Sequence, residues 1–166
     1  MKPKVFLLMG VSGCGKTTVG KALAVRLGWD FFDADDFHPA ENIEKMRLGI
    51  PLDDQDRAPW LASLHALIST RLKEDKPCVV TCSALKERYR QILLAGNRGV
   101  QIVYLKGDYD LIWNRMAFRP GHYMKPEMLK SQFEALEEPA YGLPLDASLP
   151  VDELVGLILR HTGVSG

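Results

Sequence analysis

The sequence predicts an α/β fold in which helices cover both faces of a parallel sheet. Short apolar runs alternate along the chain with segments whose apolar residues recur at helical spacing. The run at 77–82 is almost continuously apolar, which is typical of a strand buried on both faces. With 166 residues, no internal repeat and no low-complexity linker, the chain is predicted to form one domain, 1–166.

Each element follows from its local pattern. Short apolar runs bounded by turn signals predict five strands, at 4–9, 29–32, 77–82, 100–105 and 143–145. Apolar residues at helical spacing predict seven helices, at 15–27, 39–47, 60–72, 86–94, 110–118, 126–136 and from 150 onward. Gly28 and Gly49 suit helix ends, and Pro39 suits a first helical turn. The acidic run at 51–56 either forms a turn or caps the third helix.

A glycine-rich loop follows the first strand. It satisfies the pattern G-x-x-x-x-G-K-[ST], and this pattern between a strand and a helix predicts a phosphate-binding loop. Its glycines let backbone N–H groups face an anion, and the helix N-terminus adds its positive end. Lys16 is expected to reach the phosphates and to act in catalysis. The residues expected to bind the nucleotide are Gly10, Val11, Ser12, Gly13, Cys14, Gly15, Lys16, Thr17 and Thr18.

Carboxylates end the second strand, at the edge where parallel sheets bind ligands. Thr17 and Asp33 are the residues expected to hold Mg²⁺, directly or through water. Asp35 is expected to orient or deprotonate an acceptor hydroxyl. The alternative is that the run 33–36 forms a turn that binds no metal.

A turn signal near 119–123 interrupts the helical pattern and predicts a short lid at about 115–128. Arg115 and Arg119 lie one helical turn apart and are expected to clamp the transferring group when the lid closes. Alternatively, both arginines are solvated helix residues. His122 in the lid, and His38 beyond the aspartates, are candidates for substrate contact, whereas His65 and His161 are interpreted as structural.

Composition limits the class of partner. Lys plus Arg and Asp plus Glu both total 21, so the formal net charge is zero, which argues against nucleic acid or an anionic membrane as partner. The three cysteines provide too few ligands for a zinc site and are interpreted as reduced thiols. The first strand begins too early for a signal sequence, so a cytoplasmic location is expected.

Several stretches together resemble one enzyme family. Beyond the phosphate loop, these are Asp33-Ala34-Asp35 with His38-Pro39, Asn42-Ile43-Glu44-Lys45-Met46, Pro51 to Arg57 with Pro59-Trp60-Leu61, Cys82-Ser83-Ala84-Leu85-Lys86 with Tyr89-Arg90, Tyr104-Leu105-Lys106-Gly107, and Arg119-Pro120-Gly121-His122. The chain resembles the short, phosphate-loop type of gluconokinase, including the thermoresistant gluconokinases, which is related to shikimate kinase and the nucleoside-monophosphate kinases.

This resemblance implies a P-loop NTPase fold, similar to nucleoside-monophosphate kinases, with strand order 2-3-1-4-5. It also implies phosphorylation of D-gluconate at the 6-hydroxyl, with ATP and Mg²⁺, and a homodimer.

A sugar acid needs a fixed cation for its carboxylate and several hydrogen-bonding partners for its hydroxyls. The available cations are Lys45, Arg57, Lys86 and Arg90, and the available partners are Asp35, His38, Asn42 and Ser83. Arg57 is favoured for the carboxylate by analogy with the acid-binding arginine of shikimate kinases.

Two alternatives remain open at this stage. Another small-molecule kinase of the same fold, acting on shikimate or a nucleoside monophosphate, would share the loop, the lid and the magnesium site. A non-catalytic nucleotide-binding module would share the loop alone.

Overall fold

The computed structural model describes residues 2–117 and 126–165, and it contains the expected five-stranded sheet. The strand order is β2-β3-β1-β4-β5, and each neighbouring pair is parallel. The strands are β1 (Val5–Met9), β2 (Asp30–Asp33), β3 (Cys78–Thr81), β4 (Val100–Lys106) and β5 (Leu143–Asp146). The predicted fold class and strand order are therefore confirmed.

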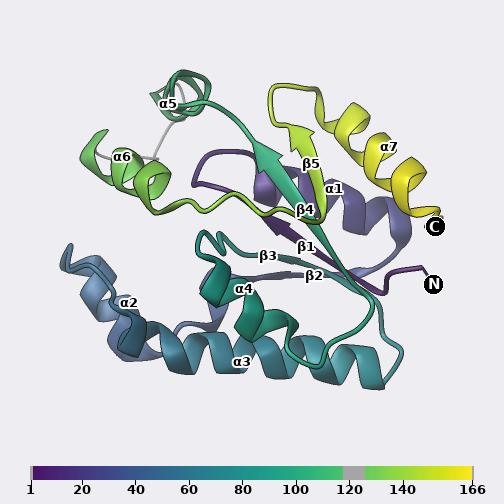
Figure 1. Cartoon of the computed structure of the whole chain (residues 1–166), viewed down its shortest axis with the longest axis horizontal. Coiled ribbons are helices and arrows are strands. Elements are labelled where there is room, and N and C mark those ends of the chain that lie inside the picture. The colour runs from purple at the N-terminus through teal and green to yellow at the C-terminus, as the bar shows by residue number, and fades with distance from the viewer. Residues whose placement is uncertain (1, 118–125, 166) are drawn as a thin grey trace.

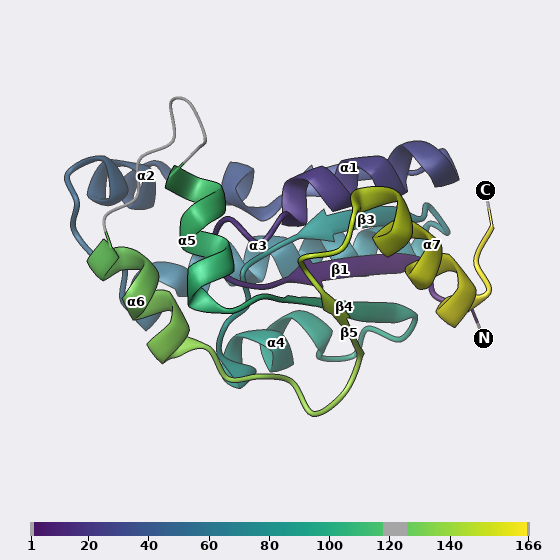
Figure 2. The same ribbon diagram turned by 90° about the horizontal axis from the view of Figure 1, so that it is seen from above.

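Helices form a layer on each face of the sheet (Figures 1 and 2). In chain order they are α1 (Lys16–Leu27), the 3-10 turn η1 (Ala34–Phe37), α2 (Ala40–Arg47), α3 (Asp54–Lys73), α4 (Glu87–Leu94), α5 (Tyr109–Ala117), α6 (Pro126–Ala135) and α7 (Val151–Thr162). One apolar layer joins the sheet to α1 and α7, and the other joins it to α3 and α4. Strand β1 contributes alternate residues to both layers, which explains why all five of its residues are buried.

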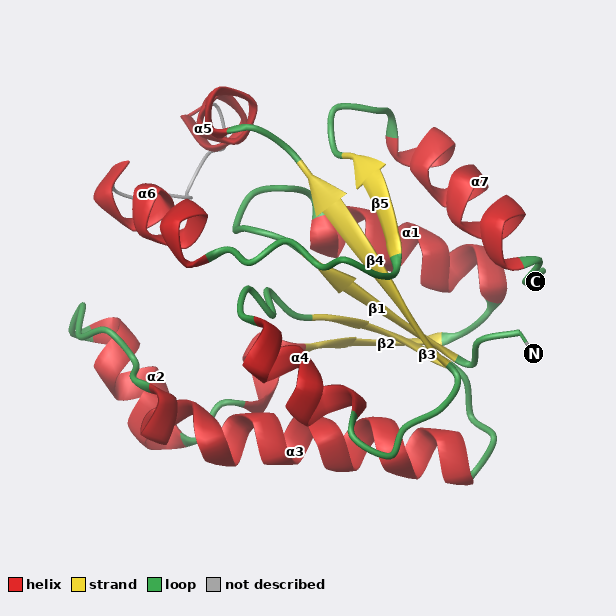
Figure 3. Ribbon diagram, in the orientation of Figure 1, coloured by secondary structure: helices red, strands yellow, loops and turns green. Residues whose placement is uncertain are grey.

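The carboxyl ends of the strands point toward the end of the molecule that carries α2, α5 and α6 (Figure 3). Both chain termini lie at the opposite end (Figure 1). The phosphate loop, the aspartates after β2 and the segment after β3 therefore share one edge of the sheet, as expected for ligand-binding residues of a parallel sheet.

Helix α3 begins at Asp54 rather than at 60, because the acidic run supplies its cap. The Asp53 carboxylate accepts a hydrogen bond from the Asp56 N–H at 2.8 Å, and the Asp56 carboxylate accepts one from the Asp53 N–H at 3.1 Å. This reciprocal pair is a capping box, and it satisfies two backbone donors at the helix start. The capping interpretation of the acidic run is confirmed.

The three cysteines, Cys14, Cys78 and Cys82, are free and buried. Burial raises the pKa of the Cys78 thiol to about 11 and that of the Cys82 thiol to about 12, so both remain protonated at neutral pH.

Within the described ranges, no helix has the length and apolar character needed to cross a bilayer.

Arg90 on α4 is a fully buried cation. Its guanidinium donates to the backbone carbonyls of Ala84 and Glu137, each at 2.7 Å, and to the hydroxyl of Tyr141 at 3.3 Å. Glu87 provides the counter-charge at 3.3 Å. Arg90 therefore joins the segment after β3 to the segment between α6 and β5.

We expect Arg90→Ala to lower the free energy of unfolding by about 3–5 kcal/mol, because it leaves buried carbonyls without donors. Urea unfolding followed by circular dichroism measures the loss. Arg88→Ala is the matched control, because Arg88 lies on the same helix with an exposed side chain whose ion pair with Asp54 is also exposed. Equal effects of the two substitutions would contradict a structural role for Arg90.

Candidate active site

The phosphate loop connects β1 to α1 through glycines in the left-handed region. Gly10, Gly13 and Gly15 have φ values of 148°, 83° and 100°. A Cβ atom on Gly10 would lie 2.7 Å from Cys14 Sγ and 2.8 Å from the Leu105 carbonyl oxygen. The loop shape therefore depends on glycine at this position.

The N-terminus of α1 is left open for an anion. Gly15 provides no side-chain cap, and the first turn contains no acidic residue. Helix α3, in contrast, has both a capping box and acidic residues in its first turn. Because unpaired N–H groups and the helix dipole both attract negative charge, the start of α1 is suited to bind phosphate.

Lys16 packs against the phosphate loop. Its ammonium donates to the carbonyl oxygens of Gly10 at 2.8 Å and Val11 at 3.0 Å. A cation therefore lies beside the open helix start, where phosphate charge would be neutralised.

Gln132 on α6 also contacts this loop, a role that sequence reasoning missed. Its side-chain carbonyl accepts from the Ser12 N–H at 2.7 Å, and its amide donates to the Ser12 hydroxyl at 2.9 Å. The two residues are 120 positions apart, and no local motif marks Gln132. Only the fold brings α6 to the phosphate loop.

A cavity of about 280 Å³ opens beside the start of α1. Arg115 lines it and donates to the Cys14 carbonyl at 3.3 Å and to the Ala147 carbonyl. The other lining residues include the loop glycines Gly13 and Gly15, Thr18, and apolar side chains from α1, α5 and the region where α7 begins: Val19, Met116, Leu149, Val151 and Leu154. A mostly apolar wall next to a phosphate loop is suited to a nucleoside, so this placement favours a nucleotide contact for Arg115 over a clamp on the transferring group.

The other two lid residues expected at the site, Arg119 and His122, lie outside the described residues. The described flanks of the expected lid are α5 and the start of α6.

Asp33 and Asp35 lie at the junction of β2 and η1. The Asp33 carboxylate caps the turn by accepting from the Asp35 N–H at 3.0 Å. Desolvation raises the pKa of the Asp35 carboxyl, and the negative charge of Asp33 raises it further, whereas the charges of His38 and Lys16 lower it. A carboxylate with a raised pKa is the better proton acceptor, which suits Asp35 to the role of general base.

The residues expected to hold Mg²⁺ fit a hydrated magnesium ion. Thr17 and Asp33 supply the oxygen atoms that Mg²⁺ prefers, and MgATP sites typically use few protein ligands. Thr81 pairs with Asp33 in the sheet register, and its buried hydroxyl has no hydrogen-bond partner in the described structure. A water of the ion's hydration shell is the kind of partner that this hydroxyl lacks.

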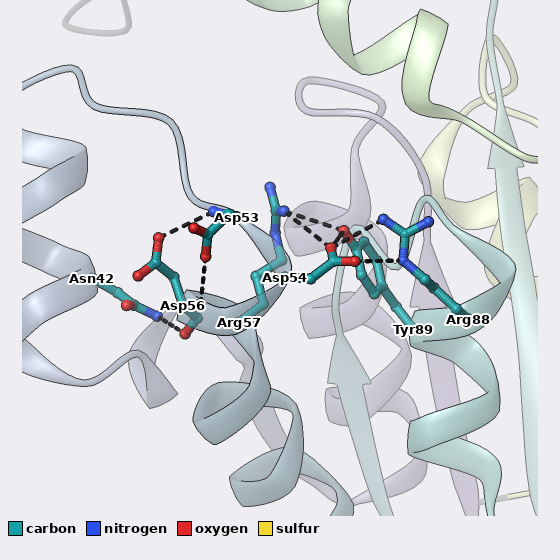
Figure 4. A network of polar contacts seen from close by, with 7 residues as sticks. All are labelled: Asn42, Asp53, Asp54, Asp56, Arg57, Arg88 and Tyr89. Atoms are coloured by element: carbon teal, nitrogen blue, oxygen red, sulfur yellow. Dashed lines mark hydrogen bonds and ion pairs between the residues drawn. The ribbon is translucent and has the colours of Figure 1, made fainter.

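Arg57, on the first turns of α3, belongs to a polar network with α4 (Figure 4). One of its terminal nitrogens donates to the Tyr89 hydroxyl at 3.1 Å and lies 3.9 Å from the Asp54 carboxylate. The guanidinium also lies over the Tyr89 ring, 5.4 Å from its centroid. The other terminal nitrogen makes no contact with the residues drawn in Figure 4, and the side chain is 31% exposed. Arg57 is therefore oriented by the protein and still accessible to an anion.

The other expected substrate cations are placed differently. Lys45 forms a 2.7 Å ion pair with Asp56 and remains 39% exposed. Lys86 is the residue that precedes α4. Arg90 has its donors occupied in the core, and this burial argues against a direct substrate contact. Ser83 lies beside the phosphate loop, because its carbonyl accepts from the Gly10 N–H at 3.3 Å.

His38 stacks on Trp60 of α3, with ring centroids 4.2 Å apart. Its Nδ1 lies 3.2 Å from the side-chain nitrogen of Asn42, which is only 2% exposed. His65, in contrast, is bonded to the Ala95 carbonyl at 2.8 Å, in agreement with a structural role.

This geometry defines a class of protein. An open phosphate loop, an adjacent cavity for a nucleoside, a carboxylate suited to proton transfer and a separate accessible cation are the parts of a P-loop kinase that acts on a small anionic acceptor.

Comparisons with known proteins agree. The family model for shikimate kinase matches residues 12–142. The chain is 45% identical to a probable gluconokinase of Mus musculus, over 89% of this chain and 92% of that protein. It is 43% identical to the thermoresistant gluconokinase of Escherichia coli (strain K12), over 91% of this chain and 89% of that protein. A crystal structure of a gluconokinase from Sinorhizobium meliloti 1021 matches with a TM-score of 0.87 and 40% identity, covering 97% of this chain and 92% of that chain. The chain therefore belongs to the gluconokinase family, within the wider group of shikimate kinase-like enzymes.

We expect Arg115→Ala to raise the KM for ATP about tenfold, because it removes the guanidinium that lines the cavity and joins it to the phosphate loop. The KM for the acceptor should change much less. Steady-state kinetics with each substrate varied in turn measures both constants. Arg26→Ala, at the far exposed end of α1, is the control. A larger effect on the acceptor would place Arg115 at the transferring group instead.

Proposed function

We propose that the protein phosphorylates D-gluconate at its 6-hydroxyl, using ATP and Mg²⁺, to give 6-phospho-D-gluconate and ADP. One observation carries the proposal beyond family membership: the aspartates after β2 and the accessible cation Arg57 lie on adjoining elements at the same edge of the sheet as the phosphate loop. Trp60 of α3, the helix that carries Arg57, donates at 2.7 Å to the carbonyl of Ala34, which lies between Asp33 and Asp35. A sugar acid has its carboxylate at one end and the 6-hydroxyl at the other, so it suits a site with these two ends.

In the proposed reaction, the loop N–H groups and Lys16 hold the phosphates of ATP. Asp35 takes the proton of the 6-hydroxyl as its oxygen forms a bond to the γ-phosphorus. The bond from that phosphorus to the bridging oxygen breaks, and ADP leaves. Thr17 and Asp33 would hold Mg²⁺, which would supply positive charge that stabilises the transferring phosphoryl group. Arg57 binds the gluconate carboxylate and thereby sets the distance of the hydroxyl from ATP.

We also propose a homodimer in the cytoplasm. The family resemblance supports the dimer, and α2 with the following turn exposes the apolar side chains of Ile43, Met46, Leu48 and Ile50. The three free cysteines fit a reducing compartment. Light scattering coupled to size-exclusion chromatography measures the oligomeric state, and a monomer at micromolar concentration would contradict the dimer.

The experiment that tests the function is a coupled assay of ADP release with MgATP against D-gluconate, shikimate, other sugar acids and nucleoside monophosphates. Lys16→Ala is the blank, because it removes the phosphate-loop cation. Release that depends on gluconate supports the proposal. ADP release with a different acceptor would support a kinase activity but would show that gluconate is not the substrate. No release with any acceptor would favour the non-catalytic nucleotide-binding module.

We expect Asp35→Asn to lower kcat at least 100-fold with a smaller change in the KM for gluconate, because a general base acts mainly in the transition state. Asp36→Asn is the control, since it removes the neighbouring carboxylate of the same turn. An unchanged kcat with a raised KM would reduce Asp35 to a binding residue.

We expect Arg57→Ala to raise the KM for gluconate about 10- to 100-fold, which corresponds to a charged hydrogen bond of about 1.5–3 kcal/mol. The KM for ATP should stay nearly constant. Arg88→Ala tests whether the effect is specific, because Arg88 contacts the same Asp54 carboxylate and the same Tyr89 ring. If affinity for ATP falls instead, Arg57 belongs to the nucleotide site.

A further inference from the structure

The environment of Asn42 determines which of its side-chain atoms is the nitrogen. The atom assigned as Nδ2 lies 2.8 Å from the backbone carbonyl oxygen of Asp56. A carbonyl oxygen can only accept, so the opposite orientation would set two acceptors against each other without a proton. The amide orientation of Asn42 therefore follows from the chemistry of the Asp56 carbonyl.

This orientation in turn determines the proton on His38. The same Asn42 nitrogen lies 3.2 Å from His38 Nδ1 and carries a second hydrogen. Because the nitrogen donates, Nδ1 must accept, and the proton of the neutral ring must lie on Nε2. Asn42 is almost completely buried, and both of its amide hydrogens are engaged within the protein. The sequence suggested a direct substrate contact for Asn42, but its described contacts place it behind His38.

The His38 ring is also held in position. It stacks on Trp60 with an angle of 14° between the planes, and Trp60 donates from Nε1 to the Ala34 carbonyl at 2.7 Å. Ala34 lies between Asp33 and Asp35, so the tryptophan fixes the ring relative to the proposed base. Across the part of the chain that the structure describes, His38 Nε2 has no hydrogen-bonding partner. Nδ1 of the imidazole is therefore bonded within the protein, and Nε2 is available to a ligand.

We propose that Asn42 is a positioning residue that fixes His38 in the Nε2–H tautomer, and that His38 Nε2–H donates a hydrogen bond to a hydroxyl oxygen of the acceptor. The acceptor as a sugar acid rests on the proposed function, whereas the tautomer does not. His38 contributes to specificity by donating a hydrogen bond to a hydroxyl of the polyol, whereas Arg57 binds the carboxylate of the same molecule.

The charges around the ring favour this neutral donor. Desolvation lowers the pKa of His38, and the positive charge of Arg57 lowers it further, whereas the negative charge of Asp35 raises it. The Asp56 carboxylate, whose backbone carbonyl binds Asn42, is paired with Lys45. A neutral His38 also removes one of the two positive charges that lower the pKa of Asp35, so that only Lys16 lowers it.

Nitrogen NMR of the ¹⁵N-histidine-labelled free enzyme at pH 7 tests the tautomer directly. We expect a protonated Nε2 and an unprotonated Nδ1 for His38, assigned by loss of the signals in His38→Gln. His65 is an internal reference, because its Nε2 must donate to the Ala95 carbonyl. A protonated Nδ1 in the wild-type protein, or an equal mixture of tautomers, would overturn the proposal without any variant being needed.

Asn42→Asp tests whether the residue at position 42 determines the tautomer of His38, because a carboxylate of the same shape accepts a hydrogen bond where the amide donates one. We expect the His38 proton to move to Nδ1, or the ring to become doubly protonated, while the His65 signals remain unchanged. The KM for gluconate should rise about tenfold, as for one lost hydrogen bond.

The same substitution in a His38→Gln background separates positioning from structure. A glutamine places an amide donor near the position of Nε2 whichever group stands at 42. The carboxylate introduced by Asn42→Asp faces the Asp56 carbonyl in both backgrounds, so this cost is shared, and Asn42→Asp should raise the KM for gluconate clearly less in the His38→Gln background than in the wild-type protein. Equal costs in the two backgrounds would reduce Asn42 to a structural residue and overturn the proposal. A wild-type protein with the Nε2–H tautomer but no turnover of gluconate would instead overturn the proposed function and leave the role of Asn42 intact.

Discussion

The uncapped, positive N-terminus of α1 at the end of the central strand is the constraint on which the arrangement of the site depends. Strand β1 lies at the centre of the sheet and contributes to both apolar layers, so its end is among the most firmly held points of the fold. The glycine-rich loop leads from this end to the uncapped start of α1, and Lys16 adds a positive charge that is held against the loop. The other parts of the site are arranged around this anchor.

The proposed acceptor side is built from η1, α2 and the starts of α3 and α4, which satisfy many of their own polar groups. The turn η1 is capped by Asp33, α3 by Asp53 and Asp56, and Arg57 is held by Tyr89 of α4. Most polar atoms of this wall are therefore oriented before any ligand binds. Such preorganisation lowers the entropy lost on binding, and it explains how a short helix such as α2 can contribute to a precise site.

The sequence predicted the elements well because their signals are local. The phosphate loop, the apolar strands and the capping aspartates are each readable within a few residues, and the order of the strands followed from the family resemblance. The roles of Gln132, Trp60 and Arg90 were not predictable in this way, since each depends on a partner more than 20 positions away in sequence. Asn42 was recognised as important, but only the Asp56 carbonyl shows that its amide faces the protein.

Asp56 connects three functions within one residue. Its carboxylate completes the cap of α3 and pairs with Lys45, and its backbone carbonyl orients Asn42 and, through it, His38. Asp56, Lys45, Asn42 and His38 therefore form one network. The free-energy changes caused by substitutions at these residues cannot be summed as independent contributions. A change of acceptor preference would therefore require the concerted replacement of several residues of this network, whereas the contacts of the phosphate loop with Lys16 and Gln132 lie outside it.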